Sequence, residues 1–331
     1  MNTYGTIFRI SIFGESHGPS VGVIIDGCPA GIALGADDFV TDIERRKGGT
    51  KGTTPRKEDD IPVFLSGVFN GNTTGAPLTI TFENNNTRSS DYEKLRSTPR
   101  PGHADFVASK KFGGFEDYRG GGHFSGRLTV CIVAAGVVAK KILKAASADI
   151  TCNATIKEIG GETNIDKGLQ KAIDAKDSIG GIVECVVENL PIGLGEPFFN
   201  SAESLISHAV FSIPAIKGIE FGAGFAAAKM FGTAHNDALE NAAGKTITNH
   251  AGGIVGGITN GNDLVFRVVV KPTSSTPKEQ QTFNIETENI ESFSVKGRHD
   301  LCIALRVPVV LEAVTAFVLA DLLMLENRNK F

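Results

Sequence analysis

Histidine and aspartate side chains stand in short glycine-rich turns of this 331-residue chain, where they are placed to transfer protons. His17 lies in the run FGESHG, His103 in RPGHAD, and Asp300 ends KGRHD. Histidine exchanges a proton near neutral pH, and a rigid turn can hold it beside an anion contact. Each run also has a plainer interpretation: a solvated histidine, a structural turn, and a buried ion pair that caps a strand, respectively.

Two basic, glycine-rich segments are suited to bind anions. The first, ERRKGGTKG, contains Arg46; arginine forks match phosphate and carboxylate oxygens, although a solvated helix end is the other meaning of such a run. The second, YRGGGHFSGR, ends at Arg127 before an apolar run. Its N–H groups, a helix dipole, Ser125 and Arg127 would converge on negative charge, which we favour over a tightly packed turn. The spacing matches neither a dinucleotide fingerprint nor a P-loop.

Two further segments suit a flat or phosphorylated ligand. The glycines of NHAGGIVGG, from Asn249 to Gly257, let a bulky ligand approach the backbone closely. The run KPTSS, Lys271–Ser275, offers hydroxyls and a cation, which suit phosphate oxygens or the edge of a flavin ring. A hydroxyl-rich turn is the alternative for this second segment.

Short strands and a few longer helices must position these turns. β-Branched runs bounded by Gly, Asn or Pro predict strands over Ile7–Phe13, Val21–Ile25, Pro62–Val68, Leu78–Phe82, Gly181–Val187 and Leu264–Val270. Apolar spacing with start and stop signals predicts helices over Phe39–Arg46, Leu128–Ala145, Pro197–His208 and Pro308–Leu325. Two polar segments are expected to be long loops, Thr50–Asp60 and Thr276–Asn289.

Strand pairs and single helices alternate in both halves of the chain, which predicts an α+β layered fold. No linker-like segment divides the sequence, so we expect one domain over residues 1–331. Strand–turn–strand patterns around His17 and His250 are similar enough to suggest an internal repeat of two halves.

Composition argues against several classes of protein. The chain is 41% hydrophobic and 21% charged with a formal net charge of −4, so we expect neither nucleic acid nor a membrane as partner. The five cysteines are scattered without metal-type spacing, which indicates reduced thiols, a cytoplasmic location and no metal site. No signal-peptide pattern is present. The apolar stretch Val307–Leu325 carries Glu312 and Asp321, so we do not expect it to span a membrane.

Taken together and in this order, the segments from residue 13 to residue 300 resemble the chorismate synthase family. The resemblance implies a β-α-β sandwich, with helices packed between antiparallel sheets, and a homotetramer. It implies a lyase that converts 5-enolpyruvylshikimate-3-phosphate to chorismate and phosphate by 1,4-anti elimination, the last common step towards the aromatic amino acids. The family uses reduced flavin mononucleotide (FMN) with no net redox change, and the protein supplies position, protons and charge.

The resemblance also implies roles for individual residues. His17 would protonate the leaving phosphate, His103 would keep the reduced flavin in its productive protonation state, and Asp300 would help to remove the ring proton. Substrate would be bound by Ser16, Arg46, Arg100, Ser125, Arg127 and Arg298. Flavin would be bound by His123, Phe124, Ser125, Asn236, Gly256, Lys271, Pro272, Thr273, Ser274, Ser275 and Arg298.

Some positions depart from the common family pattern. Many members have Arg at His123, Ser at Phe124, Glu at Leu128 and a basic residue at Gly52. The chain has no added flavin-reductase region, so reduced flavin would come from an external reductase or another source, and direct use of NADPH (an NADP-linked activity) stays open. A different flavin or phosphate-sugar enzyme on the same scaffold is one alternative function. A non-catalytic binding protein is another, which the retained histidines and aspartate disfavour.

Overall fold

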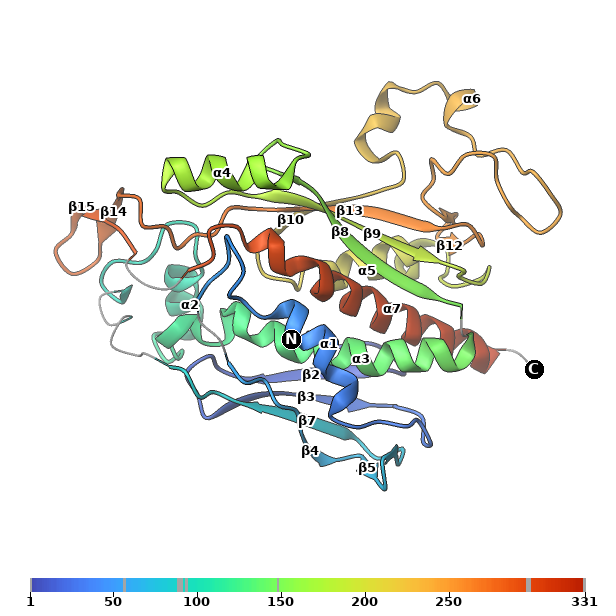
Figure 1. Ribbon diagram of the computed structural model, residues 1–331, viewed down its shortest axis with the longest axis horizontal. Coiled ribbons are helices and arrows are strands. Elements are labelled where there is room, and N and C mark those ends of the chain that lie inside the picture. The colour runs from blue at the N-terminus through green and yellow to red at the C-terminus, as the bar shows by residue number, and fades with distance from the viewer. Residues whose placement is uncertain are drawn as a thin grey trace.

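Two antiparallel sheets enclose a layer of helices in the computed structural model (Figure 1). The structure describes residues 2–55, 58–87, 92, 95–147, 149–295 and 299–329. The first sheet runs in the order β1 (Thr3–Tyr4), β2 (Arg9–Gly14), β3 (Ser20–Asp26), β7 (Leu78–Glu83) and β4 (Val63–Ser66). The second runs in the order β10 (Ile216–Phe221), β13 (Leu264–Val270), β9 (Gly181–Glu188) and β8 (Thr151–Ile159). This architecture confirms the predicted α+β sandwich.

The helical layer contains the apolar core. It comprises α1 (Asp37–Arg46), α3 (Thr129–Ala146), α5 (Ala202–Val210) and α7 (Val307–Asn329). α3 packs on the first sheet, α7 packs on the second, and the two helices run along each other. Smaller elements lie around this frame: β5 (Val68–Phe69), β6 (Asn72–Thr73), α2 (Asp105–Phe112), α4 (Ile165–Ala175), α6 (Gly232–His235), β11 (Ile254–Val255), β12 (Ile258–Thr259), β14 (Gln280–Asn284) and β15 (Asn289–Phe293).

The α7 helix is apolar on all sides because protein surrounds it on all sides. It is long and apolar enough to cross a membrane by length and composition, but it is buried between the sheets. Its two central carboxylates are both compensated. Glu312 accepts hydrogen bonds from Arg45 and Lys140, and Asp321 accepts from backbone N–H groups before β2. A buried charge is tolerated when it is paired in this way.

Most predicted elements are present, and the exceptions have local causes. The helix predicted over Pro197–His208 begins only at Ala202, because Ser201 caps it by accepting the N–H of Ser204. The loop predicted over Thr276–Asn289 is partly wrong, since it contains β14, which forms a hairpin with β15. The sequence analysis also misses β8, β10, α2 and α4, which are short or rich in polar residues.

Gly136 allows α3 and α7 to approach closely. A Cβ added at this position would lie 2.5 Å from the Cα of Ala313 on α7. We therefore expect Gly136→Ala to lower the free energy of unfolding by about 1–3 kcal/mol, measured by urea denaturation. Gly35→Ala is the control, because a Cβ there would meet open space. Equal stability of the two variants would contradict this account of the packing.

Candidate active site

A cavity of about 690 Å³ opens at the end of the helical layer where α1 ends and α3 and α7 begin. Most of the residues expected to bind ligands line it: Arg46, Arg100, His103, His123, Phe124, Ser125, Arg127, Lys271, Pro272, Thr273, Ser274, Ser275 and Asp300. The volume is typical of small-molecule sites. Helix N-termini carry partial positive charge, so α3 and α7 favour an anionic ligand here.

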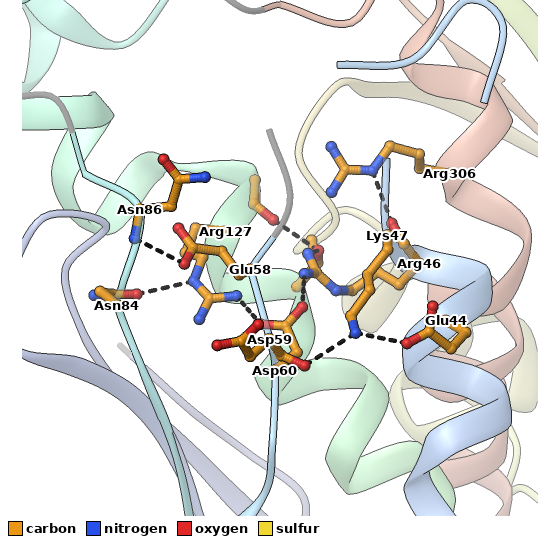
Figure 2. Close-up of polar contacts among 12 residues, drawn as sticks. Glu44, Arg46, Lys47, Glu58, Asp59, Asp60, Asn84, Asn86, Arg127 and Arg306 are labelled. Carbon is orange, nitrogen blue, oxygen red and sulfur yellow. Dashed lines mark hydrogen bonds and ion pairs between the residues drawn. The ribbon is translucent and has the colours of Figure 1, made fainter. Parts of the chain in front are cut away.

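The carboxylate of Asp60 joins two of the expected anion contacts (Figure 2). Arg46 donates to it at 2.6 Å from the end of α1, and Arg127 donates to its other oxygen from the segment before α3. Burial would raise the pKa of Asp60, but the two guanidinium groups outweigh burial and hold that pKa below its ordinary value. Asp60 is therefore ionised at neutral pH.

Asp300 is held by the chain segments around it. It accepts hydrogen bonds from the N–H of Thr54 at 2.9 Å and from Arg306 at 3.0 Å. Arg306 in turn donates to the carbonyl of Arg46 at 2.8 Å, so Asp300 and the end of α1 are linked (Figure 2). Arg306 lines the cavity and belongs to no sequence motif that we singled out.

The turn RPGHAD orients His103 through an aspartate. Nδ1 of His103 lies 2.6 Å from Asp105 and 3.0 Å from Arg100. Because guanidinium nitrogens only donate, the Nδ1 proton belongs with the carboxylate, and Nε2 remains for a ligand. Burial opposes ionisation of Asp105, but hydrogen bonds from Arg100 and His103 hold its pKa far below the ordinary value.

The run KPTSS closes the cavity beside this turn. Lys271 donates to the carbonyl of Gly102 at 2.8 Å, and Arg100 donates to the hydroxyl of Ser275 at 3.1 Å. Burial and the nearby charge of Lys217 lower the pKa of Lys271. The hydroxyl of Thr273 is buried without a hydrogen-bond partner among the described residues, so it is available to a ligand.

The triple glycine places Ser16 and His17 directly behind the cavity wall. Gly120 lines the cavity at a φ of 61°, and a Cβ on it would lie 2.5 Å from Nε2 of His17. His17 also packs edge-on against Tyr92, which lines the cavity. The hydroxyl of Ser16 is buried and has no hydrogen-bond partner among the described residues. Only glycine allows the imidazole this close to the wall.

The departures from the family pattern have structural counterparts. His123 contacts the carbonyl of Gly14 at 2.8 Å and the side chain of Asn2 at 3.1 Å, so the N-terminal segment holds the imidazole. Gly52 has a φ of 87°, and its carbonyl accepts the N–H groups of Leu301 and Cys302 next to Asp300. Phe124 and Leu128 both line the cavity.

Five of the expected residues are not among those that line the cavity of this chain. Ser16 and His17 lie behind its wall, and the other three are Asn236, Gly256 and Arg298. Asn236 and Gly256 are exposed; Asn236 directly follows α6, and Gly256 lies between β11 and β12. In Figure 1, α6 and β12 are on the right, whereas α3 and α7 begin at the cavity on the left. Arg298 lies outside the described residues. Among the residues that the structure describes, no group of three or more His, Cys, Asp or Glu side chains is placed to hold a metal ion.

The depressed pKa of Asp105 predicts a pH-dependent stability. This carboxylate stabilises the folded state above its unfolded pKa of about 3.9, and the contribution is lost as the pH falls through the lower folded pKa. We expect Asp105→Asn to lower the free energy of unfolding by about 3 kcal/mol at pH 7. Urea denaturation should show the difference from the unsubstituted protein shrinking below about pH 4. A difference that does not depend on pH would contradict the assignment.

Comparisons with known proteins identify the family of this chain. A family model described as chorismate synthase matches residues 8–324. A chorismate synthase of Chitinophaga pinensis is 72% identical over 329 residues, covering 99% of this chain and 98% of the relative. One of Dehalococcoides mccartyi is 44% identical, covering 97% of this chain and 96% of the relative. A solved structure described as the crystal structure of a chorismate synthase matches with a TM-score of 0.72 at 25% identity, covering 98% of this chain and 93% of that one. The chain therefore belongs to the chorismate synthase family.

Proposed function

We propose that this chain converts 5-enolpyruvylshikimate-3-phosphate to chorismate and phosphate by 1,4-anti elimination with reduced FMN. The observation that carries the proposal is the single cavity in which cationic side chains, two helix N-termini and proton-transfer groups meet. The substrate has a phosphate and two carboxylates, and the departing phosphate gains charge. Preorganised cations and N–H donors stabilise such a transition state.

The cationic wall would bind the substrate. Arg46, Arg127 and Arg306 lie together at the α1 end, and Arg100 lines the same cavity beside His103. Nε of Arg46 is buried and has no partner among the described residues, so it is a donor free for a substrate oxygen. With Ser16 and Ser125 nearby, this wall supplies donors for the phosphate and carboxylates.

The residues of the cavity also fit FMN. The hydroxyl of Thr273, the cation of Lys271 and the neighbouring serines of the run KPTSS would hold it, together with Phe124 and His123, which line the same cavity. When bound, reduced FMN would supply electron density transiently to the elimination. The remaining chemistry is binding, orientation and proton transfer by the chain's own residues.

Three side chains would move protons. His17 packs against Gly120, and no side chain at that position separates its imidazole from a phosphate bound in the cavity. His103 donates Nδ1–H to Asp105, which orients Nε2 as a donor or acceptor for the ligand. Asp300 would act as the base, and its contact with Arg306 at 3.0 Å orients the carboxylate.

We further propose a homotetramer in which neighbouring chains complete the flavin site. Large aromatic side chains are strongly exposed near the second sheet, at Phe198, Phe199, Phe225 and Phe231. Asn236 and Gly256 belong to the same part of the chain and lie outside its own cavity. Burying such a surface against a second copy would cover the aromatic groups and bring these two residues to a neighbour's site.

The cellular location, the source of reduced FMN and the domain organisation are also proposals, which the family and the chain itself support. All five cysteines are free thiols, which suits a cytoplasmic enzyme. Reduced FMN would come from an external flavin reductase, and direct use of NADPH remains an alternative source. One continuous hydrophobic core supports a single domain over the chain.

An anaerobic assay with dithionite-reduced FMN tests the proposed reaction by following chorismate formation. We expect the unsubstituted enzyme to be active, and His17→Ala, His103→Ala and Asp300→Ala each to lower the rate by about 10²–10⁴-fold, as for lost acid–base groups. No chorismate from the unsubstituted enzyme would overturn the function. Full activity in all three variants would remove these roles and leave the family assignment intact.

Sedimentation velocity tests the proposed assembly. We expect a mass four times that of the chain, and we expect Phe225→Asp to dissociate it because a buried charge would replace an aromatic contact. The dissociated protein should bind FMN more weakly, measured by fluorescence titration. A monomer at micromolar concentration that binds FMN fully would contradict the shared site.

A further inference from the structure

We infer that Asp60 is a positioning residue of this site, holding Arg46 and Arg127 side by side as one anion-binding unit; the inference rests on the proposed function. All three side chains are buried: those of Arg46 and Arg127 are 4% and 3% exposed, and that of Asp60 is 0% exposed. Each oxygen of Asp60 takes one guanidinium group (Figure 2).

Charge explains why the carboxylate is needed. Without the carboxylate between them, the two buried guanidinium groups would repel each other at close range. Burial lowers the pKa of Arg46 to about 10, the charges of Arg306 and Arg127 act in the same direction, and Asp60 opposes them. With Asp60 ionised, two cations and one anion leave a net positive unit facing the cavity.

The remaining hydrogen bonds fix where the unit points. Arg127 donates to the side chain of Asn84 at 2.9 Å and to the carbonyl of Glu83 at 3.0 Å, so the end of β7 holds it. Arg46 donates weakly to Thr129 at 3.3 Å, and its Nε has no partner among the described residues. Arg127 is thus the anchored member of the pair, and Arg46 is the member left to meet a ligand.

The backbone is bent to deliver this carboxylate. Asp60 has a φ of 53°, which lies in the left-handed region that residues other than glycine seldom adopt. Hydrogen bonds also fix the two residues before it. Glu58 accepts the N–H of Asn86 at 3.1 Å, and Lys47 donates to the carbonyl of Asp59 at 2.9 Å (Figure 2). These contacts hold residues 58–60 beside the cavity.

Glu312 provides a matched control within the same helical layer. It is also a buried carboxylate, 3% exposed, and it also pairs with two cations, Arg45 and Lys140. None of these three side chains lines the cavity. If Asp60 had only a structural role, removal of its charge should leave anion binding unchanged, as we expect for Glu312.

The test is equilibrium binding to Asp60→Asn and Glu312→Gln, by titration calorimetry with 5-enolpyruvylshikimate-3-phosphate and separately with inorganic phosphate. Removing a negative charge would by itself tighten anion binding, whereas loss of positioning weakens it. We expect both dissociation constants to rise about tenfold in Asp60→Asn and to stay unchanged in Glu312→Gln, although both variants should melt at lower temperature. Unchanged or tighter binding by Asp60→Asn would overturn the inference.

A second variant covers the case in which Asp60→Asn does not fold. Asp60→Glu keeps the charge and moves the carboxylate by one methylene, so we expect a severalfold rise in the same dissociation constants with the fold retained. Unchanged binding by Asp60→Glu would then overturn the inference. Phosphate binding is measured without turnover, so these results stand apart from the chorismate assay, which alone decides the proposed function.

Discussion

Carboxylates placed behind cationic side chains are the constraint on which this cavity depends. Bare guanidinium groups at this depth would lose several kcal/mol of hydration each and would repel one another. The structure compensates them in pairs: Arg46 and Arg127 with Asp60, Arg100 with Asp105, and Arg306 with Asp300. Because one carboxylate serves two guanidinium groups at Asp60, these four arginines keep a net positive charge while each has a carboxylate partner.

The helical layer determines where these pairs meet. The C-terminal end of α1 and the N-terminal ends of α3 and α7 converge at the cavity. A second ion cluster, in which the buried Glu312 binds Arg45 and Lys140, ties the same three helices together farther from the cavity. Close packing of α3 on α7 and this cluster fix the helix ends, and the helix ends fix the distances between the anion contacts. The packing of the core therefore determines the geometry of the anion-binding residues.

The sequence analysis recovers the elements with strong periodicity and the runs with unusual composition. The two long apolar helices and the β-branched strands are where they were expected, because burial on several faces leaves a clear pattern. The runs around His103 and Arg127 both line one cavity. What the sequence analysis misses are single residues with no local signal. Asp60 and Arg306 acquire their meaning only from partners brought close by the fold.

The start of the chain is bound to the body of the protein. Asp321 accepts the N–H groups of Thr6, Ile7 and Phe8 at 2.7–2.8 Å, and the residues just before them run along the cavity as far as His123. α7 begins at the cavity and runs away from it to Asn329, on the right of Figure 1. An affinity tag or surface tether fused ahead of residue 2 would therefore crowd the ligand site, whereas one attached after α7 would leave it open.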